Sequence, residues 1–141
     1  MSVSPGQHAL LALFRAAARL RRQLDDVPAS QGLSPSQYNV LRILRGAGSP
    51  LPIMTIRDRM IDSQPSITRL VDRLEVRGLL ERIPSTEDRR RVDCRVTSAG
   101  RELLAEMDEP IDAADRAVMS RLSASELKTL KELLDRVGRP D

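Results

Sequence analysis

The chain has 141 residues and a mass of 15.7 kDa, which suits one compact domain. It carries 23 basic and 20 acidic side chains, a formal charge of +3, and 40 % apolar residues, typical of a soluble and mostly helical protein. Its single cysteine excludes an internal disulfide and a thiolate zinc site, and its single histidine excludes multi-histidine metal centres. We expect no metal or cofactor, and a reducing, cytoplasmic location.

Charge and hydropathy are unevenly distributed. Residues 1–56 carry six basic and two acidic side chains, whereas residues 96–141 carry seven basic and ten acidic ones. A basic front suggests a side that faces a polyanion, although ordinary ion pairing at the surface explains the same charges. The apolar run Ala9–Phe14 is too short to cross a membrane, so no membrane partner is expected.

Two helices are predicted at the start of the chain. Apolar residues recur every three or four positions over Gly6–Leu24, which indicates an amphipathic helix, and residues 25–32 break it. Ser34 and Gln37 have the spacing of a capping box and begin a second helix that extends to about Arg45.

A pair of helices joined by a tight turn comes next. Ile53–Met60 forms a short helix, and Ile61–Ser63 is the turn. Ser63 then caps a helix that extends to Arg77 and ends at Gly78 in the left-handed conformation. Its buried stripe leaves the polar side chains for solvent or DNA, and we expect the reading set to be Ser63, Gln64, Ser66, Thr68, Arg69 and Arg73, with Asp72 beside them.

Two strands with a charged loop follow this helix pair. Leu80–Ile83 precedes a polar loop over residues 84–91, and Val92–Thr97 alternates with period two, so that Val92 and Cys94 face inward and Asp93 outward. The loop contains the candidate wing residues Asp88, Arg89, Arg90 and Arg91. Adjacent cations repel, and a phosphate backbone or minor groove would relieve this; Asp88 is expected to orient one arginine by ion pairing. A charged loop that only protects the hairpin edge is the alternative.

The chain returns to helix from Ser98. Pro110 is expected to kink or interrupt this helix, which resumes at Ile111. A second capping box, Ser123–Glu126, opens a last helix that reaches Val137. Helix, helix, short helix, turn, helix and hairpin is the order of a winged helix–turn–helix.

Five motifs in this order resemble the MarR family of dimeric winged-helix transcriptional regulators. They are Leu33–Leu41, Ile67–Leu74, Gly78–Arg82, Asp88–Arg90 and Val96–Gly100. The resemblance implies that Ile67–Leu74 lies in the major groove and that Arg90 enters the minor groove. It also implies a dimer built from the first and the last two helices, with a small-molecule pocket between those helices and the DNA-binding lobe.

We therefore predict a mainly α fold with a small β-hairpin wing, a winged helix–turn–helix with N- and C-terminal dimerisation helices. Residues 1–32 and 98–141 form the dimerisation region, and residues 33–97 form the DNA-binding lobe. The first and last helices are each apolar on one side, and packing across a two-fold axis would bury both. The symmetry predicts a pseudo-palindromic operator.

The predicted function is a homodimeric, ligand-responsive repressor that binds specific double-stranded DNA. A winged-helix module for protein–protein assembly is the alternative, and an enzyme is not expected because no phosphate loop, metal motif or nucleophile–histidine pair is present. The candidate effector pocket comprises Phe14, Arg15, Tyr38 and Arg42. Cys94 is a candidate oxidation sensor, but its phase in the strand favours a buried structural role.

Overall fold

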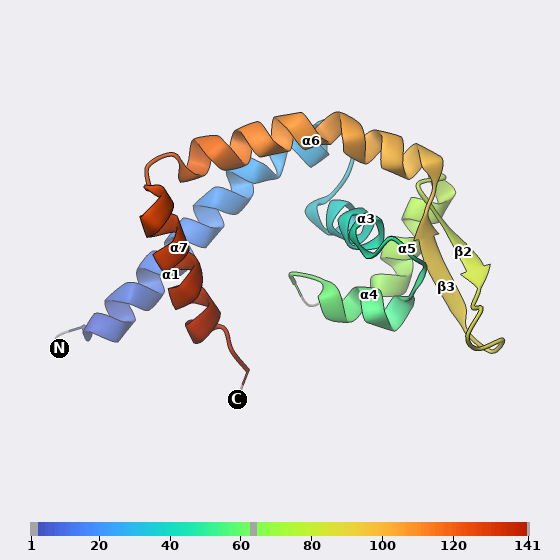
Figure 1. Ribbon diagram of the computed structural model, residues 1–141, viewed down its shortest axis with the longest axis horizontal. Helices are drawn as coiled ribbons and strands as arrows, with labels where there is room; N and C mark the ends of the chain where they lie inside the picture. Colours follow the sequence, from blue (N-terminus) through green and yellow to red (C-terminus); the bar gives the residue numbers. More distant parts are fainter. Residues whose placement is uncertain (1–2, 63–64, 141) are drawn as a thin grey trace. The chain divides into compact units, whose positions relative to one another are not determined.

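The computed structural model describes residues 3–62 and 65–140, which form helices and one small antiparallel sheet (Figure 1). In chain order the elements are α1 (Pro5–Leu24), α2 (Asp26–Ser30), α3 (Pro35–Ala47), β1 (Leu51–Pro52), α4 (Ile53–Arg59), α5 (Ile67–Val76), β2 (Leu80–Pro84), β3 (Val92–Val96), α6 (Ser98–Met119) and α7 (Ala124–Val137). The predicted class, mainly α with a hairpin wing, is confirmed. None of the described helices is long and apolar enough to cross a membrane.

The chain divides into two compact units. One comprises the described residues of Met1–Leu24 and Ile111–Asp141, and the other is Asp25–Pro110. The second unit extends beyond the expected lobe of residues 33–97 at both ends, because α2 packs on α3 and the first half of α6 contributes buried side chains. The assignment of the two parts to dimerisation and DNA binding stays a prediction.

The core of Asp25–Pro110 is built from apolar stripes of its helices and sheet. Burial of a large apolar side chain such as leucine contributes about 1.5–3 kcal/mol to the free energy of folding. The most deeply buried are Val40, Leu41 and Leu44 of α3, Ile56 of α4, Val71 and Leu74 of α5, Leu80 of β2, Cys94 of β3, and Leu104 and Met107 of α6.

Helix boundaries follow the predicted capping residues. Ser34 Oγ accepts a hydrogen bond from the Gln37 backbone N–H at 3.1 Å, and the Gln37 side chain accepts one from the Ser34 N–H at 2.9 Å. The second box, between Ser123 and Glu126, is also present. Gly78 has φ = 72°, the left-handed conformation that ends α5. These three predictions are confirmed.

Apart from the start of α5, which is described with the site, the helices differ from expectation at two places. The segment expected to break after α1 contains the single-turn helix α2, which ends at Ser30. Pro110 does not interrupt α6, which continues from Ser98 to Met119, so of the two expected effects only a kink stays a prediction. A proline lacks one backbone N–H and so removes one hydrogen bond of the helix. The other backbone hydrogen bonds, on both sides of Pro110, keep the segment helical.

The sheet has three strands rather than two, in the order β1-β3-β2. Leu51 of β1 pairs with Cys94, and Pro52 with Asp93, which makes β3 the central strand. The predicted alternation fails at the start of β3: Val92 is 47 % exposed, whereas Asp93 is buried. Asp93 is drawn inward as the ion-pair partner of Arg91, whose Nε lies 3.3 Å from its Oδ1.

Candidate nucleic-acid interface

Helix α5 has an exposed polar face and, on its other side, a buried apolar stripe. It begins at Ile67 rather than at Ser63, and Ser66 lies in the turn that precedes it. Ser63 and Gln64 lie outside the described residues. Ser66, Thr68, Arg69 and Arg73 are exposed, as the sequence predicted, because Ile67, Val71 and Leu74 point into the core.

Arg82 of β2 ties the wing to α5. Its Nη1 donates to Glu75 Oε1 at 2.7 Å and its Nη2 to Asp72 Oδ1 at 2.5 Å, while its backbone N–H donates to Glu75 Oε2 at 3.0 Å. Partial burial opposes the charged guanidinium, but the bonds to Asp72 and Glu75 prevail and raise the pKa of Arg82 above its ordinary value. Asp72 is exposed, as the sequence predicted, and its carboxylate is also engaged by the wing.

A second arginine fixes the C-terminal end of α5. The Arg77 side chain donates to the backbone carbonyls of Gly32 at 2.9 Å and Gln31 at 3.2 Å, which lie between α2 and α3. The side chains of Arg69 and Arg73, in contrast, have no hydrogen-bond or ion-pair partner among the described residues. The helix is therefore anchored at one end and carries unpaired positive charge on its exposed face.

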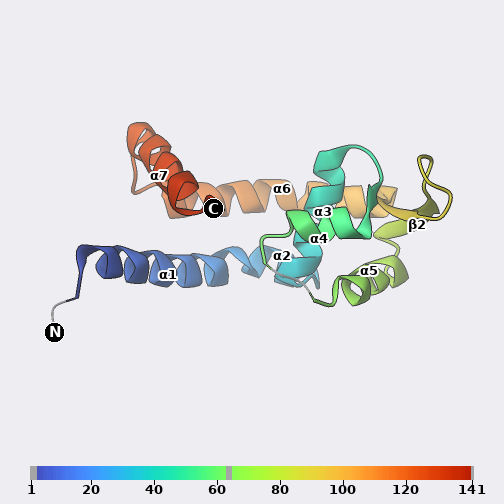
Figure 2. The ribbon, with the colours of Figure 1, turned by 90° about the horizontal axis from the view of Figure 1, so that it is seen from below.

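The hairpin of β2 and β3 projects away from α3, α4 and α5 of its own unit (Figures 1 and 2). The loop at its tip is organised by Ser85, which is only 6 % exposed. Its hydroxyl accepts from the backbone N–H groups of Glu87 at 3.2 Å and Asp88 at 3.3 Å, and its own N–H donates to the Arg91 carbonyl at 3.0 Å. Ser85 was missed by sequence reasoning; a serine at the head of a polar loop was the one available signal.

The three arginines of the tip have different environments. Arg91 is held by Glu87 at 3.4 Å and Asp93 at 3.3 Å. Arg89 and Arg90 are exposed, and within residues 3–62 and 65–140 their side chains have no hydrogen-bond or ion-pair partner. Among the described residues, Arg89 and Arg90 thus have no side-chain partner, whereas Arg91 braces the loop; contact of the wing residues with DNA stays a prediction.

Asp88 acts on the backbone rather than on a guanidinium. Its Oδ1 accepts the Arg90 backbone N–H at 2.9 Å, and its carbonyl accepts the Arg91 N–H at 3.0 Å. The expected ion pair with an arginine side chain is replaced by a turn that fixes the direction in which the chain presents Arg90.

The four candidate effector residues fall in both units. Tyr38 and Arg42 come together on α3, where the Arg42 Cζ lies 5.6 Å from the centroid of the Tyr38 ring. Phe14, which is 61 % exposed, and Arg15 lie on α1. The effector pocket stays a prediction.

Cys94 has the environment of a core residue. It is fully buried on β3, and burial raises the pKa of its thiol to about 11. Because the thiolate is the reactive form, this thiol is poorly suited to sensing oxidants. Among the described residues there is also no cluster of three or more histidine, cysteine or carboxylate side chains that could hold a metal ion.

Comparison with known proteins places these features in a family. A model described as the MarR family matches residues 33–92. The transcriptional regulator MhqR of Bacillus subtilis is 33 % identical over 132 residues, covering 91 % of this chain and 90 % of the relative. The regulator PecS of Dickeya dadantii is 32 % identical over 129 residues, covering 90 % and 78 %. The crystal structure of a MarR transcription factor from Planctomyces limnophilus is 35 % identical, covers 96 % of this chain and 98 % of its own, and superposes with a TM-score of 0.71.

Proposed function

This chain belongs to the MarR family, and from that premise we propose that it is a homodimeric transcriptional repressor that binds specific double-stranded DNA. The observation that carries the proposal is the pairing of two cationic surfaces in one unit. Arg69 and Arg73 are exposed on α5, and Arg89 and Arg90 on the wing tip, and their side chains have no hydrogen-bond or ion-pair partner among the described residues.

The two surfaces support different parts of DNA recognition. A helix such as α5 fits the major groove, where Arg69 can donate to base edges and the Thr68 hydroxyl can donate or accept. Arginines on a narrow loop suit the minor groove and the phosphates, so Arg90 supplies affinity that falls with salt. Arg82 of β2 bonds Asp72 and Glu75 of α5, and these contacts limit movement of the wing relative to the helix.

The homodimer is supported by two helices on which no residue is fully buried within one chain. Along α1 and α7, which are described throughout, no residue is buried. Exposed apolar side chains on these helices are Leu10, Leu11, Phe14, Leu133, Leu134 and Val137. Helices with such stripes need a partner surface, and a two-fold copy supplies one.

Protein–protein assembly without DNA readout is less well supported. It calls for an apolar patch on the exposed face of α5, but Thr68, Arg69 and Arg73 occupy that face. The exposed apolar residue of this helix, Val76, lies at its C-terminal end.

The proposal also includes regulation by a ligand in the cytoplasm. The effector would change the separation of the two reading helices of the dimer.

A mobility-shift titration with the DNA upstream of the protein's own gene tests this function. The expected result is binding about 1,000-fold or more tighter than to a shuffled duplex of the same composition. Sedimentation of the free protein should give a dimer. Equal affinity for both duplexes would contradict the proposal, and so would a monomer at the concentrations used for binding.

A further inference from the structure

A long-range hydrogen bond holds the turn that leads from α4 towards α5. The backbone N–H of Ile61, just after α4, donates to Asn39 Oδ1 of α3 at 3.0 Å, across 22 positions of the sequence. Helix α3 lies beside both α4 and α5 (Figure 1). Asn39 is half-buried and belongs to none of the sets assigned above to base, phosphate or effector contact. Its bond to the turn therefore needs an explanation of its own.

Helix α5 begins without the side-chain cap that begins α3 and α7. Its N-cap residue, Ser66, makes no side-chain cap hydrogen bond among the described residues. Ile67 and Val71 are buried and fix which side of the helix faces the core, but apolar contacts have no preferred direction. A hydrogen bond has a defined length and angle, so the bond to Asn39 adds a directional constraint to the chain that enters α5.

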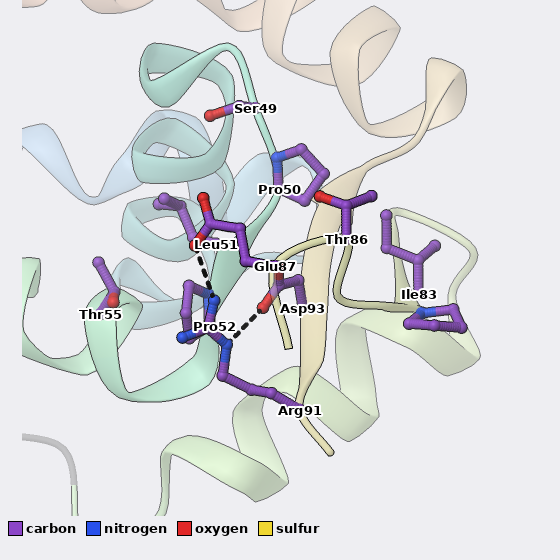
Figure 3. A pocket seen from close by; sticks show the side chains of 11 residues that line it. Ser49, Pro50, Leu51, Pro52, Thr55, Ile83, Thr86, Glu87, Arg91 and Asp93 are labelled. Carbon is purple, nitrogen blue, oxygen red and sulfur yellow. Dashed lines mark hydrogen bonds and ion pairs between the residues drawn. The ribbon is translucent and has the colours of Figure 1, made fainter. Parts of the chain in front are cut away.

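The opposite end of α5 is fastened to the same part of the unit. The Arg77 side chain donates to the carbonyls of Gly32 and Gln31, which directly precede α3, at 2.9 and 3.2 Å. The other bracing contacts act elsewhere: Arg82 bonds side chains in the C-terminal half of α5, and Arg91 is paired at the base of the wing (Figure 3). The contact of Asn39 thus acts on the N-terminal side of α5.

We propose that Asn39 is a positioning residue for base recognition. By accepting the Ile61 N–H, it fixes the path of the chain into α5 and so the direction in which the first turn of this helix presents Thr68 and Arg69. Helix α3 is a firm support for this contact, because Val40 and Leu41, which follow Asn39, are both 0 % exposed.

This inference rests on the proposed function and predicts a loss of specificity rather than of general affinity. A change in the direction of α5 moves a base-reading donor away from its acceptor. Contacts with phosphates depend mainly on charge and tolerate such a change. The quantity to measure is therefore the specificity ratio, the affinity for the duplex upstream of the protein's own gene divided by that for a shuffled duplex of the same composition.

Asn39→Ala removes the acceptor and places the residue with the highest helix propensity in α3, so the fold is retained. Its specificity ratio should fall about fivefold or more in anisotropy titrations. Asn39→Asp keeps an oxygen that accepts the Ile61 N–H and should keep the ratio of the parent protein. The negative charge that it adds weakens binding to both duplexes alike and cancels in the ratio. NMR of the free variants should show faster exchange of the Ile61 amide hydrogen in Asn39→Ala alone.

Ser34→Ala is the matched control on the same helix. It also removes a side-chain oxygen that accepts a backbone N–H, that of Gln37 at 3.1 Å, but this bond is local and does not reach the turn before α5. It should lower the urea midpoint of unfolding at least as much as Asn39→Ala and leave the specificity ratio unchanged.

The outcomes separate the positioning role from the proposed function. A parent protein that binds both duplexes equally would overturn the proposed function and this proposal with it. A parent protein that discriminates, together with an Asn39→Ala variant that discriminates equally well, would overturn the positioning role alone. An equal fall of the ratio in Ser34→Ala, or a fall in Asn39→Asp while its Ile61 amide stays protected, would also overturn that role.

Discussion

Arg82 and Glu75 are joined twice, through the backbone N–H of Arg82 at 3.0 Å and through its guanidinium at 2.7 Å. One residue lies on β2 and the other on α5, so this contact couples the wing directly to the helix that we propose reads bases. The coupling limits how the two surfaces can rotate against each other, which matters because both must fit adjacent grooves of one duplex.

Replacing Arg82 with Gln should weaken operator binding without changing its salt dependence. Arg82 is ion-paired with Asp72 and Glu75 and is not expected to contact phosphate. Its replacement therefore removes no phosphate contact, but it leaves two carboxylates without their cation. We expect a stability loss of about 1 kcal/mol, since both carboxylates are partly exposed. Anisotropy titrations at several salt concentrations and urea unfolding measure the two effects.

Arg95→Gln is the matched control for this variant. Arg95 is likewise ion-paired, with Glu81 at 2.5 Å, but its side chain is 53 % exposed and its partner lies across the hairpin on β2 rather than on α5. It should leave operator affinity near that of the parent protein. A loss of affinity equal to that of Arg82→Gln would show that the link to α5 is irrelevant.

Arg90→Ala should weaken binding to every sequence and reduce the salt slope by about one unit, because one phosphate-neutralising side chain is lost. Arg91→Ala should also weaken binding, but with an unchanged slope, since Arg91 is held by Glu87 and Asp93. Titrations from low to moderate salt separate the two variants. Parallel salt plots for Arg90→Ala and the parent protein would remove the wing from the binding mechanism.

Gly100 should not tolerate a side chain. A Cβ there would overlap the Leu79 carbonyl oxygen and lie 2.7 Å from Val96 Cγ2, where α6 starts against the hairpin. Gly100→Ala should therefore destabilise the protein by about 1–3 kcal/mol. Gly46→Ala is the matched control: it lies within α3, a Cβ there has nothing within 4 Å, and the change should stabilise by about 0.5–1 kcal/mol. Thermal unfolding of both variants checks the opposite signs.

Cys94 should make stability depend on alkaline pH. Its buried thiol has a pKa of about 11, whereas the ordinary value is 9.0. Between these values the unfolded chain loses a proton that the folded chain keeps, so the contribution of this thiol to stability falls as pH rises. The difference in unfolding free energy between the parent protein and Cys94→Val should shrink from pH 9 towards pH 11. A constant difference would contradict a fully buried thiol.

Local signals in the sequence predicted most helix boundaries. Ser34 with Gln37, and Ser123 with Glu126, bring donor and acceptor together within one turn, so no distant residue is needed to predict them. The exposed face of α5 was predictable for the same reason, because the apolar stripe that ends at Leu74 fixes which side chains point outward.

The features that were missed depend on contacts between distant residues. Strand β1 has only two residues and exists because Leu51 and Pro52 pair with β3. The burial of Asp93 depends on its ion pair with Arg91 and on the third strand. Neither contact can be predicted from the alternation of apolar and polar residues within β3. Arg91 and Arg90 are adjacent and identical in type, so only the carboxylates around Arg91 reveal that it braces the loop.

Hydroxyl-radical footprinting of the dimer on its operator tests whether α5 and the wing contact adjacent grooves of one duplex. We expect two protected regions about one helical turn apart, each flanked by minor-groove protection that disappears in Arg90→Ala while the regions themselves persist. Uniform cleavage along the operator, or flanking protection that is unchanged in Arg90→Ala, would contradict it.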